Sequence, residues 1–213
     1  MGNEFPVVCI NLERSKSRRA RTEAEWRPLL GDRLEYFKAI DGRTAGLTMK
    51  RLLGGGDAAN AAACLASHLG VMEMMLERGV GEEGVAILED DVSPTERGSE
   101  IFNVVADARV YHPKLDILLL HTPFGRRLWS ISGRGGIRYP SRKINIGCTG
   151  TQLIWYSERG MRDYIKSFSN FMQTADAFGN AYPCNNGRLG NVVDPVGEHL
   201  GFEDTEIGYG RDQ

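Results

Sequence analysis

The chain has 213 residues, of which 41% are hydrophobic and 25% are charged, and its formal net charge is −2. These values are typical of a globular protein with its own core, and they exclude an overall bias toward binding polyanions. No apolar run is long enough to cross a bilayer and the N-terminus lacks the apolar core of a signal peptide, so we expect a cytoplasmic protein.

Strand and helix signals alternate along the chain. Short apolar runs rich in β-branched residues predict strands, whereas helical apolar spacing and capping residues predict helices. In chain order, we expect strands over 6–11, 34–40, 85–88, 116–121 and 151–156, and helices over 18–30, 57–79, 98–110 and 157–168. This alternation predicts an α/β sandwich with a mostly parallel central sheet.

The cysteines are far apart in the sequence. None of the pairs has the spacing of a metal site or a redox motif, so we expect thiols in a reducing compartment. The residues are Cys9, Cys64, Cys148 and Cys184.

The triplet Glu89-Asp90-Asp91 directly follows the apolar run 84–88. This context predicts a buried strand that ends in a loop. Three adjacent acids repel one another, and a bound Mg²⁺ or Mn²⁺ would relieve that repulsion because carboxylate oxygens suit hard metals. Ligand sites in open α/β sheets lie beyond the carboxyl ends of strands. The alternative is a solvated acidic turn.

A basic segment covers residues 126–143. It is rich in glycine and contains no acid, so we interpret it as a mobile loop that is either a solvated surface or a binding strip for phosphates or an anionic acceptor. Its cations are Arg126, Arg127, Arg134, Arg138, Arg142 and Lys143.

Two single residues each fit two roles. His68 lies on the apolar stripe of the helix 57–79, where a histidine is more often a packed core residue than a catalyst. Asp176 lies in a polar connector, where it fits a helix-capping acid as well as a general base. The chain has no Gly-x-Ser-x-Gly, Walker or His-Glu-x-x-His motif, which argues against the common hydrolases, nucleoside triphosphatases and zinc peptidases.

Taken in order, five blocks of the sequence resemble glycosyltransferase family 25, which includes lipooligosaccharide and collagen galactosyltransferases. Their shared order and spacing are more specific than any single block, and the resemblance covers roughly residues 7–180. The blocks are VCINLERSKSRR (8–19), FKAIDG (37–42), CLASHLGVMEMMLERG (64–79), AILEDDV (86–92) and GTQLIWYSERG (150–160).

The resemblance implies a GT-A-like fold, a nucleotide-sugar donor and a divalent metal, Mn²⁺ or Mg²⁺. By the same resemblance, Asp91 is a metal ligand and His199 a further one, while Asp176 and His68 are the catalytic candidates. The basic segment has no counterpart in the family. The residues expected to bind the donor are Asn11, Arg14, Arg18, Ser67, Glu89 and Asp90.

We therefore expect one GT-A-like domain over 1–213, with a donor half of about 1–122 and an acceptor half of about 123–213. The expected reaction is inverting transfer of galactose or glucose from a UDP-sugar to a hydroxyl of a saccharide, a protein side chain or a hydroxylated nucleobase in DNA. Inversion requires one carboxylate that takes the acceptor proton. Two other functions could use the same acids: metal-dependent phosphoryl transfer, as in a nuclease, or nucleotide-sugar binding without catalysis.

Overall fold

The structure is a computed structural model that describes residues 4–44, 56–121, 129–132, 137–140, 151–168, 188–192 and 194–200. Its strands are β1 (Val7–Asn11), β2 (Leu34–Lys38), β3 (Val85–Glu89), β4 (Val92–Pro94), β5 (Ile117–Leu119), β6 (Trp129–Ser132), β7 (Ile137–Pro140), β8 (Leu153–Tyr156), β9 (Leu189–Val192) and β10 (Gly197–His199). Its helices are α1 (Lys16–Leu30), α3 (Gly56–Glu77), α4 (Ile101–Tyr111) and α5 (Glu158–Phe168), with short 3₁₀ turns at Gly31–Arg33 and Gly98–Glu100.

The central sheet has eight strands in the order β2-β1-β3-β8-β5-β9-β7-β6. β1 is parallel to both β2 and β3, and β5 is parallel to β9. β8 lies between β3 and β5 and is antiparallel to both, so β3 and β5 point the same way. β7 is antiparallel to its neighbours β9 and β6. Only β8 and β7 therefore oppose the common direction among the described strands of this sheet, and the expected mostly parallel α/β sheet is confirmed.

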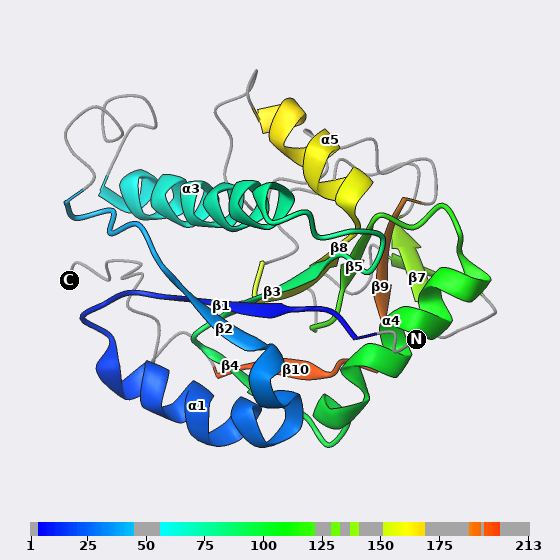
Figure 1. Cartoon of the computed structure of the whole chain (residues 1–213), viewed down its shortest axis with the longest axis horizontal. Coiled ribbons are helices and arrows are strands. Elements are labelled where there is room, and N and C mark those ends of the chain that lie inside the picture. Colours follow the sequence, from blue (N-terminus) through cyan, green and yellow to red (C-terminus); the bar gives the residue numbers. More distant parts are fainter. Residues whose placement is uncertain are drawn as a thin grey trace.

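Helices cover both faces of the sheet, with α3 and α5 on one side and α1 and α4 on the other (Figure 1). Alternate residues of β1 enter the two resulting cores, as the pleat of a strand requires. Val7 and Cys9 pack with Trp26 of α1, whereas Val8 and Ile10 pack with Met72 of α3. Because both faces are buried here, the central strands β1, β3, β5 and β8 consist almost entirely of apolar residues.

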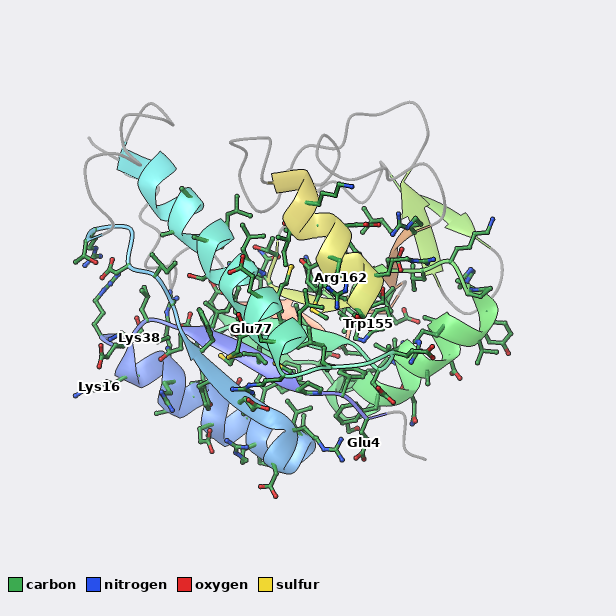
Figure 2. All side chains as sticks on the ribbon, turned by 45° about the horizontal axis from the view of Figure 1, so that its top comes forward. Glu4, Lys16, Lys38, Glu77, Trp155 and Arg162 are labelled. Atoms are coloured by element: carbon green, nitrogen blue, oxygen red, sulfur yellow. The ribbon has the colours of Figure 1, made fainter. Side chains whose placement is uncertain are left out.

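A topological switch point lies at β1. The chain leaves β1 through α1 to reach β2 on one side, and then returns through α3 to β3 on the other side. Ligands of open α/β sheets bind beyond the carboxyl ends of strands at such a point. In Figure 2, Glu4 precedes β1 and marks the amino ends of the parallel strands, and Lys38 ends β2 and marks their carboxyl ends. The triplet that begins with Glu89 lies at the carboxyl ends of these strands, as Lys38 does.

A second sheet has two strands, β4 and β10, which lie on the α1 side of the central sheet (Figure 1). β4 follows the acidic triplet directly and pairs antiparallel with β10, so that His199 lies opposite Val92. The indole nitrogen of Trp26 donates a hydrogen bond of 2.8 Å to the Val92 carbonyl and ties this sheet to α1. The small sheet therefore carries a late segment of the chain to the end of β3.

Each strand and helix expected from the sequence is present, with ends that differ by a few residues. The interpretation of 126–143 as a loop is wrong for two parts of it, because β6 and β7 form an antiparallel hairpin that joins β9. Apolar and polar residues alternate in WSIS and IRYP, and this pattern indicates strands. The glycines and cations around the two strands indicate a loop instead. The other parts of this segment lie outside the described residues. None of the helices in the described part of the chain is both long and apolar enough to cross a membrane.

Candidate functional site

A pocket opens at the carboxyl ends of β1 and β3. The empty space in and in front of it measures about 610 Å³, which includes open solvent. Its walls come from the segment after β1, the segment after β2, the middle of α3 and the acidic triplet. The lining residues are Ile10, Leu12, Arg14, Arg18, Ala39, Ile40, Asp41, Gly42, Ala63, Cys64, Ser67, Glu89, Asp90 and Asp91.

Asp90 connects β3 to the start of α1. Asn11 donates a hydrogen bond of 2.7 Å to Asp90 Oδ2, and Arg18 Nη1 donates one of 2.9 Å to Asp90 Oδ1. Arg21 Nη2 also donates to the Asp90 carbonyl at 3.2 Å. Burial raises the pKa of Asp90, and the bond from Asn11 and the charge of Arg18 offset only part of that rise. Both carboxylate oxygens are thus engaged, and Asp90 holds Arg18 at the wall of the pocket.

Glu89 connects β3 to α3 and to the start of β8. Its Oε1 lies 3.2 Å from His68 Nε2, accepts a hydrogen bond from the Thr151 hydroxyl and lies 3.7 Å from Cys64 Sγ. Burial by itself raises the pKa of Glu89, but the bonds from His68 and Thr151 outweigh it and lower the pKa below its ordinary value. Glu89 is therefore an ionised carboxylate beside the pocket at neutral pH.

Asp91 faces the small sheet. Its Oδ2 lies 3.4 Å from His199 Nε2, and its backbone carbonyl accepts a hydrogen bond of 3.1 Å from the Leu200 amide. The bond with Asp91 raises the pKa of His199 although burial alone lowers it. Asp91 Oδ1 is buried and has no hydrogen-bond partner within the part of the chain that the structure describes. A buried carboxylate oxygen without a partner is costly, and it calls for a ligand.

Asp91 and His199 fit a divalent cation. The cation would satisfy Asp91 Oδ1, and an oxygen ligand with an imidazole nitrogen is a donor set that divalent transition metals such as Mn²⁺ accept. Asp90 is a poor ligand by comparison because Asn11 and Arg18 already occupy its oxygens.

Arg18 provides a guanidinium group that can bind an anion next to the proposed cation site. One of its guanidinium nitrogens, Nη2, is buried and has no hydrogen-bond partner among the described residues. A second arginine, Arg14, forms an ion pair with Asp41 where the segments after β1 and β2 meet. Guanidinium groups bind phosphate oxygens through paired hydrogen bonds. The pocket therefore has anion-binding groups on the β1 side and a cation-binding group at Asp91.

Ser67 acts on the shape of the pocket. Its hydroxyl accepts a hydrogen bond of 2.9 Å from the Ile40 amide and donates one of 2.7 Å to the Ala63 carbonyl. These bonds hold the segment after β2 against α3. The neighbouring His68 is fully buried and does not line the pocket. Its contact with the site runs through Glu89.

The structure brings the sequence-predicted residues of its described part together. Arg14, Arg18, Ser67, Glu89, Asp90 and Asp91 line the pocket, and Asn11, His68 and His199 each contact one of the three acids. Asp176 lies outside the described residues. Thr151 was missed, since a threonine before a strand carries no signal of its own. Only the antiparallel pairing of β8 with β3 reveals its place beside Glu89.

Comparison with known proteins supports the fold. No model of a known protein family matches the sequence, and no curated protein matches it. The chain superposes on the crystal structure of a glycosyltransferase involved in the glycosylation of the major capsid of PBCV-1 with a TM-score of 0.56 at 11% identity, covering 95% of this chain and 94% of that one.

A further solved structure, mannose-1-phosphate geranyltransferase from Thermus thermophilus, gives a TM-score of 0.43 at 12% identity, covering 88% of this chain and 73% of that one. That score is too low to support an argument. At 11% identity the first likeness establishes the fold alone, and the expected GT-A-like α/β fold is confirmed on that basis.

Proposed function

We propose that this chain is a metal-dependent, inverting glycosyltransferase of the family 25 type, which transfers galactose or glucose from a UDP-sugar to an acceptor hydroxyl. The proposal combines the resemblance of the five sequence blocks, the glycosyltransferase-like fold and the chemistry of the pocket.

One observation carries the proposal. Asp91 Oδ1 and Arg18 Nη2 belong to residues of the same pocket, and both atoms are buried without a hydrogen-bond partner among the described residues. The first atom requires a cation or a proton donor, and the second requires an acceptor. A nucleoside diphosphate with its divalent cation supplies both in one ligand, which is the donor chemistry that glycosyl transfer needs.

The charge of the pocket explains why binding should depend on a metal. Its acidic lining residues are Asp41 and the triplet that begins with Glu89, and its basic ones are Arg14 and Arg18. A diphosphate would meet net repulsion from this set, and a divalent cation at Asp91 removes most of it. When bound there, the cation would also supply Lewis-acid stabilisation of the departing diphosphate.

The chain's own residues have separate tasks in this mechanism. Arg18, held by Asp90, donates to a diphosphate oxygen, and Arg14 can exchange Asp41 for a phosphate. Glu89 is ionised and oriented, so it accepts hydrogen bonds from donor hydroxyls. Ser67 holds the wall of the pocket.

Two further assignments complete the proposal. Asp176 is proposed as the general base that takes the proton of the acceptor hydroxyl, which an inverting enzyme needs opposite the bond that breaks. His68 is a positioning residue, since it is fully buried, does not line the pocket and bonds Glu89, which does. The acceptor is a saccharide, a protein side chain or a hydroxylated nucleobase.

The test is ligand binding by the purified full chain, measured by thermal unfolding and calorimetry. UDP, UDP-galactose and UDP-glucose should raise the melting temperature in the presence of Mn²⁺ and should have little effect in chelator, because a ligand of the native state stabilises it. GDP and CDP serve as matched controls for the base. If none of these nucleotides binds in Mn²⁺, the proposed function is wrong.

The transfer activity is measured with the same protein preparation. Release of UDP from the preferred donor in Mn²⁺, increased by an acceptor, would distinguish a transferase from a binding module. If the nucleotide-sugar binds tightly but is never turned over with saccharide, peptide or DNA acceptors, the catalytic part of the proposal is wrong.

A further inference from the structure

A cluster of thiol, imidazole and carboxylate groups lies at the back wall of the pocket. Cys64 and His68 are one helical turn apart on α3, and Glu89 ends β3. One ligand atom from each residue, Cys64 Sγ, His68 Nε2 and Glu89 Oε1, lies within 4.8 Å of the others. Residues at positions i and i+4 of a helix project from the same face, so the backbone itself holds the first two groups together.

The spacing of these atoms fits a tetrahedral zinc ion. Ordinary zinc–sulfur, zinc–nitrogen and zinc–oxygen bond lengths place neighbouring ligand atoms of a tetrahedron roughly 3.3–3.6 Å apart. Glu89 Oε1 lies 3.2 Å from His68 Nε2 and 3.7 Å from Cys64 Sγ. Glu89 Oε1 therefore lies near tetrahedral spacing from both other ligand atoms, and Cys64 Sγ and His68 Nε2 lie within 4.8 Å of each other.

The charges also balance. Deprotonation of the Cys64 thiol gives a thiolate, and Glu89 is a carboxylate, so the two anions neutralise one divalent ion in a largely buried place. Cys64 and Glu89 line the pocket while His68 lies behind them, which provides an entry route and leaves a coordination position on the pocket side. Three protein ligands with one open position are typical of accessible zinc sites.

We propose that Cys64, His68 and Glu89 form a binding site for Zn²⁺ that is separate from the cation site at Asp91. The ligand chemistry separates the two sites, since a thiolate selects zinc over Mg²⁺ and Mn²⁺. The site does not depend on the proposed transfer reaction.

Thr151 and the Nδ1 atom of His68 affect how tightly this site binds zinc. The Thr151 hydroxyl donates to Glu89 Oε1 and orients the carboxylate. His68 Nδ1 is buried, and within the described residues it has no hydrogen-bond partner. An acceptor behind a ligating imidazole commonly raises metal affinity by about 10–100-fold. We therefore expect weaker zinc binding than at a site that has such an acceptor.

The experiment uses the full chain, stripped of metal with a chelator, and Co²⁺ as a spectroscopic probe for zinc. One equivalent of Co²⁺ should produce a thiolate-to-metal charge-transfer band together with the intense visible absorption of tetrahedral cobalt. Zn²⁺ should abolish both, and excess Mg²⁺ should not. Cys64→Ser should lose the charge-transfer band, and His68→Gln and Glu89→Gln should each lower Co²⁺ affinity at least tenfold.

Two controls make the result specific. Cys9→Ser changes a buried cysteine outside the cluster, and Asp91→Asn changes the other cation site, so both variants should keep the wild-type spectrum. Wild-type protein without a charge-transfer band, or Cys64→Ser protein that retains it, would overturn the proposal. If Cys64→Ser fails to fold, Cys64→Ala gives the same test.

Discussion

His199 Nε2 lies 3.4 Å from Asp91 Oδ2, and the contact joins the last described strand to the end of β3. The antiparallel register of β10 with β4 places His199 opposite Val92, directly after the acids. The Leu200 amide strengthens the junction by donating to the Asp91 carbonyl. The small sheet therefore delivers an imidazole to the carboxylate whose other oxygen has no partner among the described residues.

Replacing Asp91 should separate metal binding from folding. Asp91→Asn keeps the shape of the side chain and removes its charge, so Mn²⁺-dependent UDP binding should fall by at least tenfold while the far-ultraviolet circular dichroism spectrum stays unchanged. Calorimetric titration of UDP with and without Mn²⁺ measures the effect. Glu96→Gln, which changes an exposed acid outside the pocket, is the control and should bind like wild type. Unchanged Mn²⁺ dependence in Asp91→Asn would remove Asp91 from the metal site.

The neighbouring acids should differ in their contribution to stability. Asp90→Ala removes the acceptor for Asn11 and Arg18, so it should cost about 1.5–3 kcal/mol of unfolding free energy. Asp91→Ala should cost clearly less in chelator, because it also removes a buried oxygen that no described residue satisfies. Urea unfolding of both variants in chelator gives the comparison, and equal losses would contradict the division of roles between the two acids.

The stability of the metal-free protein should depend on pH through His199. The bond with Asp91 raises the folded-state pKa of His199 above its ordinary value, so its stabilisation is fully present below the unfolded-state pKa and is lost as pH rises through the folded-state pKa. The difference in unfolding free energy between wild type and His199→Gln should therefore be larger at about pH 5.5 than at about pH 9. His112→Gln, after α4, is the control. A difference that grows with pH would show that the pair does not form.

Asp116 should stabilise the fold without acting in the site. It is buried immediately before β5, where it accepts hydrogen bonds from Ser157, Arg159 and Arg188. β5 points the same way as β3. Asp116 therefore lies at the amino ends of these strands, and Glu89 lies at their carboxyl ends. Asp116→Asn should cost about 1.5–3 kcal/mol, and a chain of this size should then melt about 3–12 °C lower.

The rise in melting temperature produced by UDP with Mn²⁺ should stay the same in Asp116→Asn. Asp107→Asn, on the exposed side of α4, should melt like wild type. Loss of UDP binding in Asp116→Asn protein that remains folded would place this residue in the functional site after all.

Several elements of the fold could be predicted because their signals are local. β1 and β3 are apolar runs buried on both faces, and the apolar stripe of α3 repeats with helical spacing. β4 (VSP), β9 (LGNV) and β10 (GEH) were not predicted, since short strands that contain proline, glycine and polar residues lack the continuous apolar run that marks β5 and β8. The hairpin of β6 and β7 was hidden by the cations and glycines around it.

The sequence by itself determined that three acids follow a buried strand, that a basic segment lies further along the chain, and that helices alternate with strands. These properties depend only on residues that are neighbours in the sequence. Only the tertiary structure decided which group meets which acid: Asn11 and Arg18 contact Asp90, His68 contacts Glu89, and His199 contacts Asp91. Those contacts depend on strand order, strand direction and register, which arise from packing between segments far apart in the chain.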